Sequence, residues 1–218
     1  MSLVIAAVVV YGFSRTVDKN LFHPGGPRPA ILYLHAVVFT GWLLFYIFQS
    51  VLVRTHNVRL HRKTGWFGAA LGLAIPLVGV STAIAMARFH TRQGAADVEG
   101  FLIVPLFDLM AFSIPFALAI YWRKKPEFHR RLILIASCAL TAAGLGRFPT
   151  YLLPEPFFYA GVDALILLGV ARDLIVNRRI HAVYLYALPA FVLGHVIVTY
   201  TFTHNSPWWL KIAHAILS

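Results

Sequence analysis

Residues 31–53 read ILYLHAVVFTGWLLFYIFQSVLV. After the basic segment RTHNVRLHRKTG (54–65), a second apolar run, WFGAALGLAIPLVGVSTAIAMAR, covers residues 66–88. Each run is long enough to cross a hydrocarbon core of about 30 Å at a rise of about 1.5 Å per residue. The pair therefore predicts two membrane-crossing helices joined by a short basic elbow.

The same alternation of apolar runs and short polar loops continues along the chain. The sequence predicts an all-α, polytopic transmembrane bundle in a single domain, 1–218, without a linker or a soluble domain. The first run is short and ends near Arg15. The tail, with its two adjacent tryptophans, predicts a short interfacial helix over 207–218. The predicted spans are 2–17, 31–53, 66–88, 101–122, 132–150, 156–176 and 182–203.

Composition supports this architecture and excludes others. Charged residues make up 12% of the chain and hydrophobic residues 59%, with a mean hydropathy of +0.73. Typical soluble domains carry about 25% charged residues. The net charge of +11 could suggest nucleic acid, but the basic residues lie in short loops between apolar runs. We therefore expect the lipid bilayer as partner, and no nucleic acid.

Loop charges predict the orientation of the bundle. The segments 54–65, 123–131 and 172–181 carry twelve Lys and Arg residues, whereas the segments on the other side carry seven. Positively charged loops remain in the cytoplasm. Seven spans then place the N-terminus inside, the C-terminus outside and the protein in the inner (plasma) membrane.

Five ionisable residues from five predicted spans lie in the outer half of the membrane: His35, Asp108, Arg147, Asp163 and His195. An ionisable side chain facing lipid near mid-membrane costs about 2.5–3.5 kcal/mol on insertion scales. We therefore expect these side chains to face inward. Asp108, Arg147 and Asp163 form the predicted intramembrane polar site. It is either a ligand, proton or cofactor site, or a structural ion pair of the aspartates with Arg147.

His35 and His195 lie at comparable predicted depths, which raises three alternatives. Facing histidines can hold a haem b between helices. A metal ion could use the same histidines together with Asp108 and Asp163, although no His-x-x-x-His or Glu-x-x-His spacing is present. The histidines could equally form hydrogen bonds between helices. The sequence leaves the three open.

The basic elbows suggest a second kind of site on the cytoplasmic side. Histidine and arginine stand at the starts of the predicted spans three, five and seven, where free backbone N–H groups favour anions. An anionic lipid head group or a phosphate could bind there; the alternative is topogenic charge with ordinary lipid contact. The candidate residues are His61, Arg62, His129, Arg130, Arg131 and His181.

A set of short motifs resembles an uncharacterised group of small bacterial multi-pass inner-membrane proteins. The resemblance covers essentially the whole chain and implies a bacterial origin and a multi-helix fold. It implies no activity. The motifs are GFSRT (12–16), LHA (34–36), LHRKTGW (60–66), VPLFD (104–108), FHRRL (128–132) and GRFP (146–149).

These features predict a membrane-embedded redox or binding protein that uses the outer polar site, with His35 and His195 as candidate ligands of a haem or metal ion. Two alternatives from other classes remain. The chain could be an accessory subunit of a larger membrane complex without chemistry of its own, or a small proton-coupled transporter in which Asp108 or Asp163 titrates.

Overall fold

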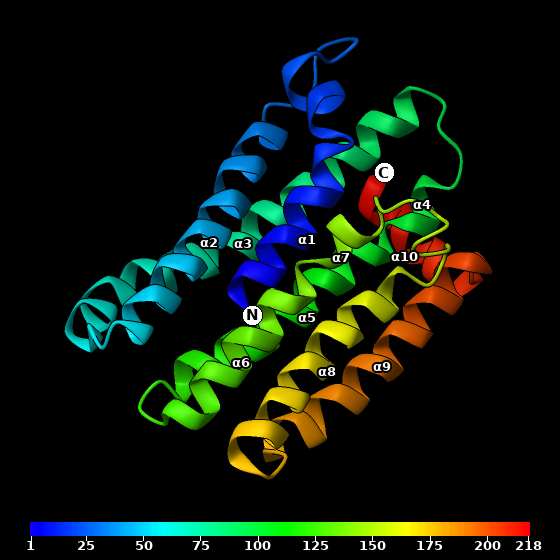
Figure 1. The fold of residues 1–218 in the computed structure, drawn as a ribbon. Coiled ribbons are helices and arrows are strands. Elements are labelled where there is room, and N and C mark those ends of the chain that lie inside the picture. Colours follow the sequence, from blue (N-terminus) through cyan, green and yellow to red (C-terminus); the bar gives the residue numbers. More distant parts are fainter.

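The computed structural model describes residues 1–218, which are 79% helical and contain no strand. Figure 1 shows the helices packed side by side as a bundle. A short π-helix, Asp18–Phe22, follows the first helix. The α-helices are α1 (Ser2–Ser14), α2 (Ile31–Arg54), α3 (Val58–Arg92), α4 (Val98–Phe101), α5 (Ile103–Tyr121), α6 (Pro126–Ala139), α7 (Ala142–Leu145), α8 (Phe158–Asn177), α9 (Ala182–Thr203) and α10 (Pro207–Leu217).

Five helical segments are long and apolar enough to cross a membrane. They are α2, α3, the nearly continuous α4–α5, the nearly continuous α6–α7, and α9. The two other predicted spans differ from these five. Helix α1 has 13 residues, a length of only about 20 Å. Helix α8 has 20 residues but contains three charged residues, Asp163, Arg172 and Asp173.

The boundaries of α9 and the tail helix α10 agree closely with the sequence prediction. The elbows are shorter than predicted. Helix α3 already begins at Val58, because the side chain of Asn57 caps it by accepting a hydrogen bond from the Leu60 N–H (3.2 Å). Helix α6 begins at Pro126, since proline is well suited to the first helical turn.

The predicted span 132–150 is interrupted. Helix α6 ends at Ala139, and the short α7 ends at Leu145. Helix α1 packs against this broken region, with Gly12 directly on the backbone of Gly144. A Cβ atom at position 12 would overlap the carbonyl group of Gly144, so this close approach requires glycine.

Hairpins organise the bundle. Helices α2 and α3 pair with each other, as do α5 and α6, and α8 and α9, while α3–α5 and α5–α9 contacts join the hairpins. Gln49 Nε2 donates to Thr64 Oγ1 (2.7 Å) across the first hairpin and so links α2 to α3. Fully buried Phe112, Ile135 and Ile166 lie in the core.

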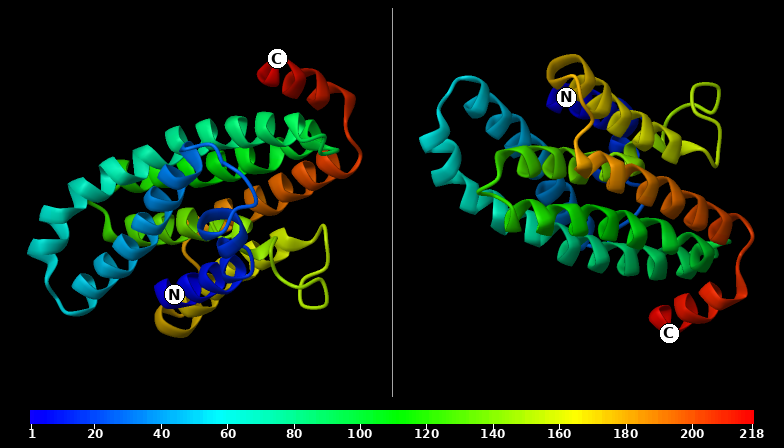
Figure 2. Two further views of the ribbon diagram at one scale, coloured as in Figure 1. Left: turned by 90° about the horizontal axis from the view of Figure 1, so that it is seen from above. Right: turned by 90° about the horizontal axis from the view of Figure 1, so that it is seen from below.

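All three basic elbows lie at one end of the bundle. The ring of His61 lies 6.3 Å from that of His129, and the ring of Phe128 lies 4.8 Å from that of His181. These contacts connect the three elbows, which Figure 1 shows at the lower end. Helix α10 turns back near the opposite end, against α3 and α4 (Figure 2). There Trp209 Nε1 donates to the Glu99 carbonyl (3.0 Å).

The outer surface carries many large apolar side chains. Leu77 on α3 is 71% exposed and Leu193 on α9 is 62% exposed. A soluble monomer rarely exposes contiguous apolar surface on this scale. Together with the five long apolar helices, this surface indicates a membrane protein whose outer faces contact lipid.

Candidate functional site

His195 and Asp163 form a buried pair between α9 and α8. His195 Nδ1 lies 2.9 Å from Asp163 Oδ1, and the His195 residue is 4% exposed. The other ring nitrogen, Nε2, makes no hydrogen bond and is not fully enclosed by protein atoms. A carboxylate that hydrogen-bonds one imidazole nitrogen fixes the orientation of the ring. The pair therefore presents one oriented, unoccupied nitrogen.

Tyr159 joins this pair to Asp108. Its hydroxyl donates to Asp108 Oδ1 on α5 (2.8 Å), and its ring stacks on that of His195 with centroids 4.2 Å apart and planes at 12°. Asp108, Tyr159, Asp163 and His195 thus form one polar cluster among α5, α8 and α9. The cluster lies in the half of the bundle away from the basic elbows.

The polar cluster contains no lysine or arginine. Neither Asp108 nor Asp163 forms an ion pair or hydrogen bond with lysine or arginine. The sequence had suggested an ion pair of these aspartates with Arg147, and the structure does not form it. The guanidinium of Arg147 instead donates to Thr16 Oγ1 (3.2 Å) and the Ala143 carbonyl, and lies 4.4 Å from the ring centroid of Phe13.

His35 lies apart from the polar cluster. Its ring stacks on Phe39 one turn later in α2 (3.9 Å), and its Nδ1 is buried without a hydrogen-bond partner. Helix α2 packs on α3 and α1, whereas α9 packs on α5, α8 and α6. In Figure 1, α2 and α9 lie on opposite sides of the bundle. His35 and His195 therefore share no partner, because their helices are not neighbours.

The four residues suggested as metal ligands were His35, His195, Asp108 and Asp163. No group of three or more His, Cys, Asp or Glu side chains in the structure is arranged to hold a metal ion. Asp163 and His195 contact each other, whereas Asp108 contacts the cluster through Tyr159. The structure thus brings three of the suggested ligands into one neighbourhood but not into a ligand set.

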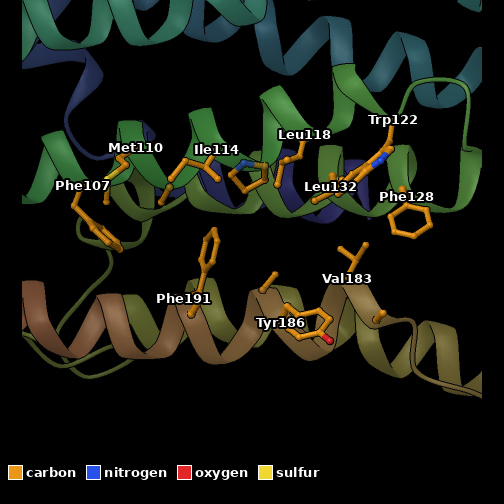
Figure 3. A pocket seen from close by; sticks show the side chains of 15 residues that line it. Phe107, Met110, Ile114, Leu118, Trp122, Phe128, Leu132, Val183, Tyr186 and Phe191 are labelled. Atoms are coloured by element: carbon orange, nitrogen blue, oxygen red, sulfur yellow. The ribbon is translucent and has the colours of Figure 1, made fainter.

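A groove of about 440 Å³ opens beside the polar cluster. Fourteen of its fifteen lining residues are hydrophobic, and they come from α5, α6, α9 and the α5–α6 loop. It extends from Phe107 to Trp122 along α5, about 22 Å at 1.5 Å per residue. Figure 3 shows Phe107 and Phe191 pointing into the space between α5 and α9.

Two phenylalanines belong to both the groove and the wall of the polar cluster. The rings of Phe107 and Phe191 lie 5.7 and 5.6 Å from that of His195, both edge-on. The position before His195 is Gly194, and a Cβ there would lie 2.6 Å from Phe107 Cζ. This glycine therefore lets the Phe107 ring lie against α9. One end of the apolar groove thus adjoins the polar cluster.

The basic elbows contain a second buried polar group that the sequence reading did not identify. Arg131 Nε donates to Asp173 Oδ2 (2.6 Å), and Arg131 Nη1 donates to Glu127 Oε2 (2.7 Å). Arg131 is 3% exposed and Asp173 is 1% exposed. Asn177 Nδ2 donates to the second oxygen of Asp173 (3.1 Å). The guanidinium of Arg131, a suggested phosphate contact, is thus occupied by protein carboxylates.

The other suggested anion contacts divide into two groups. Arg62 and Arg130 are exposed at the elbows. The histidines have inward-facing partners or none: His129 Nδ1 lies 2.9 Å from the Ala119 carbonyl, and His61 Nδ1 is buried without a partner. His181 Nδ1 accepts from the Val183 N–H (3.2 Å) and so caps α9.

Three residues of these polar groups were absent from the sequence-based list: Tyr159, Asp173 and Glu127. Tyr159 stands one helical turn before Asp163, so the two share a face of α8. Asp173 stands ten residues, or nearly three turns, beyond Asp163, at the elbow end of the same helix. The positions of Tyr159, Asp163 and Asp173 along α8 could have predicted this role, because a polar stripe on an otherwise apolar helix indicates the face that points into the bundle.

Comparisons with known proteins add no family to this description. No protein-family model, no curated protein and no solved structure matches the chain.

Proposed function

We propose that this chain is a multi-pass membrane protein that binds a lipophilic small molecule in the groove between α5 and α9, with the polar head of that molecule at His195. The observation that supports this most strongly is the shared wall: Phe107 and Phe191 line the groove and contact the ring of His195. Sites for membrane-soluble ligands combine an apolar channel with a few polar groups, and here an apolar groove lies beside a polar cluster.

Depth along the helices also supports the proposal. Asp108 is the sixth residue of α5 and Asp163 the sixth residue of α8, about 8 Å from the helix starts. Ionisable groups at such depth are costly unless they have a partner or a role. Asp108 has the Tyr159 hydroxyl as its partner and Asp163 has His195, whereas Nε2 of His195 has no hydrogen-bond partner. The unsatisfied nitrogen is the natural contact for a ligand head group.

The same proposal includes the topology. In this topology the protein lies in a bacterial inner membrane and its elbow end faces the cytoplasm. Helices α1 and α8 cross the membrane in addition to the five long apolar segments, which gives seven spans. The clustering of the three basic elbows at one end of the bundle supports this orientation. Exposed Arg62 and Arg130 then contact anionic lipids of the inner leaflet. Reporter fusions in the loops at Gly94 and Arg178 test it, and a cytoplasmic signal at Gly94 would contradict it.

The binding function can be tested by photolabelling the protein in lipid nanodiscs. The probe is a long-chain alcohol carrying a diazirine, and its control is the matching hydrocarbon without the hydroxyl. We expect both to label peptides of α5 and α9. Ala187→Trp fills the groove and should reduce labelling several-fold. Leu193→Trp on the lipid-facing side of the same helix should not.

The polar contact is tested by His195→Phe, which keeps an aromatic ring but has no hydrogen-bonding atom. This substitution should weaken labelling by the alcohol and leave labelling by the hydrocarbon unchanged, because only the alcohol has a hydrogen-bonding head. Equal labelling of the Ala187→Trp and Leu193→Trp proteins would show that the groove holds only bulk lipid. The proposed function would then be wrong.

A further inference from the structure

We infer that the elbow end of the α5–α9 groove binds an anionic phospholipid, with its phosphate at Arg123, Lys124 and Lys125 and one acyl chain in the groove. This site lies at the end of the groove away from the polar cluster, so the inference goes beyond the proposed function and does not depend on it. Three features support it: the connection between the groove and the basic loop, the absence of acidic partners for the three basic residues, and the place of the loop at the end of two membrane helices.

The apolar groove and a basic hollow meet at Trp122. The hollow has a volume of about 430 Å³ and is lined by Tyr121, Trp122 and the three basic residues that follow them in the α5–α6 loop. Trp122 also lines the groove, together with Phe128 and Leu132. Figure 3 shows these three side chains at the end of the groove opposite Phe107. One molecule can therefore place a charged head in the hollow and an apolar chain in the groove.

The three basic residues of the loop are exposed and have no acidic partner. The nearest acidic side chain in sequence, Glu127, pairs instead with Arg130 and Arg131, each at 2.7 Å. Three adjacent positive charges without a counter-ion attract an anion, and they repel the ammonium group of a zwitterionic head. The hollow therefore favours a head with net negative charge, such as that of phosphatidylglycerol, over that of phosphatidylcholine.

Aromatic rings hold two of these cations at the hollow. The guanidinium of Arg123 lies 5.6 Å from the ring centroid of Trp66, and Lys125 Nζ lies 5.9 Å from that of Phe128. Arg123 Nη1 also donates to the Ile120 carbonyl (3.2 Å). A ring attracts the charge without accepting the N–H groups as a carboxylate would. Most of the donors thus remain available for phosphate oxygens, which form charge-assisted hydrogen bonds with arginine and lysine.

The groove suits an acyl chain that enters from the loop. Helices α5 and α6 belong to segments apolar enough to cross a membrane, and the loop lies at the end of both, level with lipid heads. One leaflet supplies half of a hydrocarbon core of about 30 Å, a depth that corresponds to about ten residues of α5. Counted from Trp122, the chain passes Leu118 and Ile114 and ends before Phe107. The end of the groove beside the polar cluster stays free.

The experiment is photolabelling of the full-length protein in phosphatidylcholine nanodiscs that contain a small fraction of a phospholipid with a diazirine on its acyl chain. Two probes with identical chains are compared, one with the phosphatidylglycerol head and one with the phosphatidylcholine head. A basic residue near an anionic head contributes about a fivefold gain in affinity. We therefore expect the phosphatidylglycerol probe to label groove peptides of α5 and α9 at least about tenfold more strongly. Added salt should reduce this preference, because it screens exposed charges.

Two charge-matched triple variants separate this loop from the general charge of the elbow end. Replacing Arg123, Lys124 and Lys125 together with glutamine should reduce labelling by the phosphatidylglycerol probe to the level of the phosphatidylcholine probe. The control removes three exposed charges from the α2–α3 elbow and should keep the preference; its changes are Arg54→Gln, Arg59→Gln and Lys63→Gln. The head preference and its salt dependence are measured on the wild type, so they do not depend on any variant folding.

Equal labelling by the two lipid probes, an equal loss of preference in both triple variants, or a preference confined to peptides outside the groove would overturn the inference. Displacement of the phosphatidylglycerol probe by water-soluble glycerol phosphate would assign the loop to free phosphate and would also overturn it.

These failures are distinguishable from failure of the proposed function. The diazirine alcohol is neutral, so its sensitivity to Ala187→Trp does not depend on the charges of the loop. If that sensitivity is present while the two lipid probes label equally, only the phospholipid assignment is wrong. If the alcohol is insensitive while the phosphatidylglycerol preference is present, only the proposed function is wrong.

Discussion

Removing the carboxylate of Asp173 should be among the most destabilising single changes in the elbow half of the bundle. Arg131 and Asp173 are 3% and 1% exposed, and their side chains are joined by a hydrogen bond of 2.6 Å. Breaking a buried ion pair by removing one partner costs about 3–5 kcal/mol, because the other charge stays buried without compensation. In Asp173→Asn, that charge is the guanidinium of Arg131.

The structure places the expected cost at the lower end of this range. Arg131 keeps two other acceptors, the backbone carbonyl of Glu127 (2.6 Å) and Glu127 Oε2 (2.7 Å). The Glu127 side chain is 56% exposed, so water screens much of its attraction. We therefore expect Asp173→Asn to lower the free energy of unfolding by about 3 kcal/mol. Arg131→Met should cost a similar amount, because Asp173 then keeps only the amide of Asn177 and a long, half-exposed contact with Arg172 (3.9 Å).

The decisive measurement is a double-mutant cycle by reversible unfolding in mixed micelles. The double variant Arg131→Met/Asp173→Asn removes both charges and should recover much of the loss, giving a coupling energy above about 2 kcal/mol. Arg130→Met is the matched control: its side chain is 43% exposed and pairs with the same Glu127, so it should cost less than about 1 kcal/mol. Additive effects of the two single changes would refute the reasoning, since they would show that Arg131 and Asp173 are solvated independently.

Three further outcomes follow from the structure. Asp108→Asn should cost less than about 1 kcal/mol in the same assay, because the amide oxygen still accepts from Tyr159; a loss of 3–5 kcal/mol would instead indicate a charged partner. Gly12→Leu should destabilise the α1–α7 contact and increase proteolysis of the N-terminal segment, whereas Gly25→Leu, in open space, should not. Burial, followed by the charge of Arg131, lowers the pKa of His181 below its ordinary 6.5. The stability that neutral His181 contributes is therefore complete above about pH 6.5 and is lost as the pH falls through the lower pKa of the folded state. Hydrogen exchange of the Val183 amide, which His181 Nδ1 accepts from, can monitor this loss. The pH dependence should be absent in His181→Asn.

Hydropathy predicted the helical architecture well because a membrane-crossing segment needs about 20 apolar residues in a row, and such runs are visible without any partner. The boundaries were less predictable at the elbows. The polar residues of segment 54–65 looked like a loop, yet from Val58 onward they form the first turns of α3. A helix that extends beyond the hydrocarbon region can carry charge on all sides, so polarity there does not distinguish helix from loop.

The sequence predicted how deep the polar residues lie along their helices, but not which of them pair with one another. Helical rise placed Asp108, Asp163 and His195 at similar depth, and the structure joins them through Tyr159. Rise along the axis does not determine which helices are neighbours, so the sequence did not exclude Arg147 or His35 as partners of these residues. Arg147 instead contacts α1, and His35 lies on a helix that packs elsewhere. Tyr159 was not predicted, because its neutral hydroxyl does not stand out in an apolar helix as a charged side chain does.

In the proposed topology helix α8 crosses the membrane, although its hydropathy alone does not indicate a span. Its charged residues exclude it from the segments that are apolar enough to cross by composition. Within the bundle, however, Asp163 contacts His195 and Asp173 contacts Arg131, so neither acidic group has to face lipid. The remaining charge, Arg172, is 51% exposed near the elbow end, where a long side chain can reach the interface. In the proposed topology, partners on α6 and α9 therefore offset much of the cost of inserting the charged residues of α8, and insertion of α8 depends on those two helices.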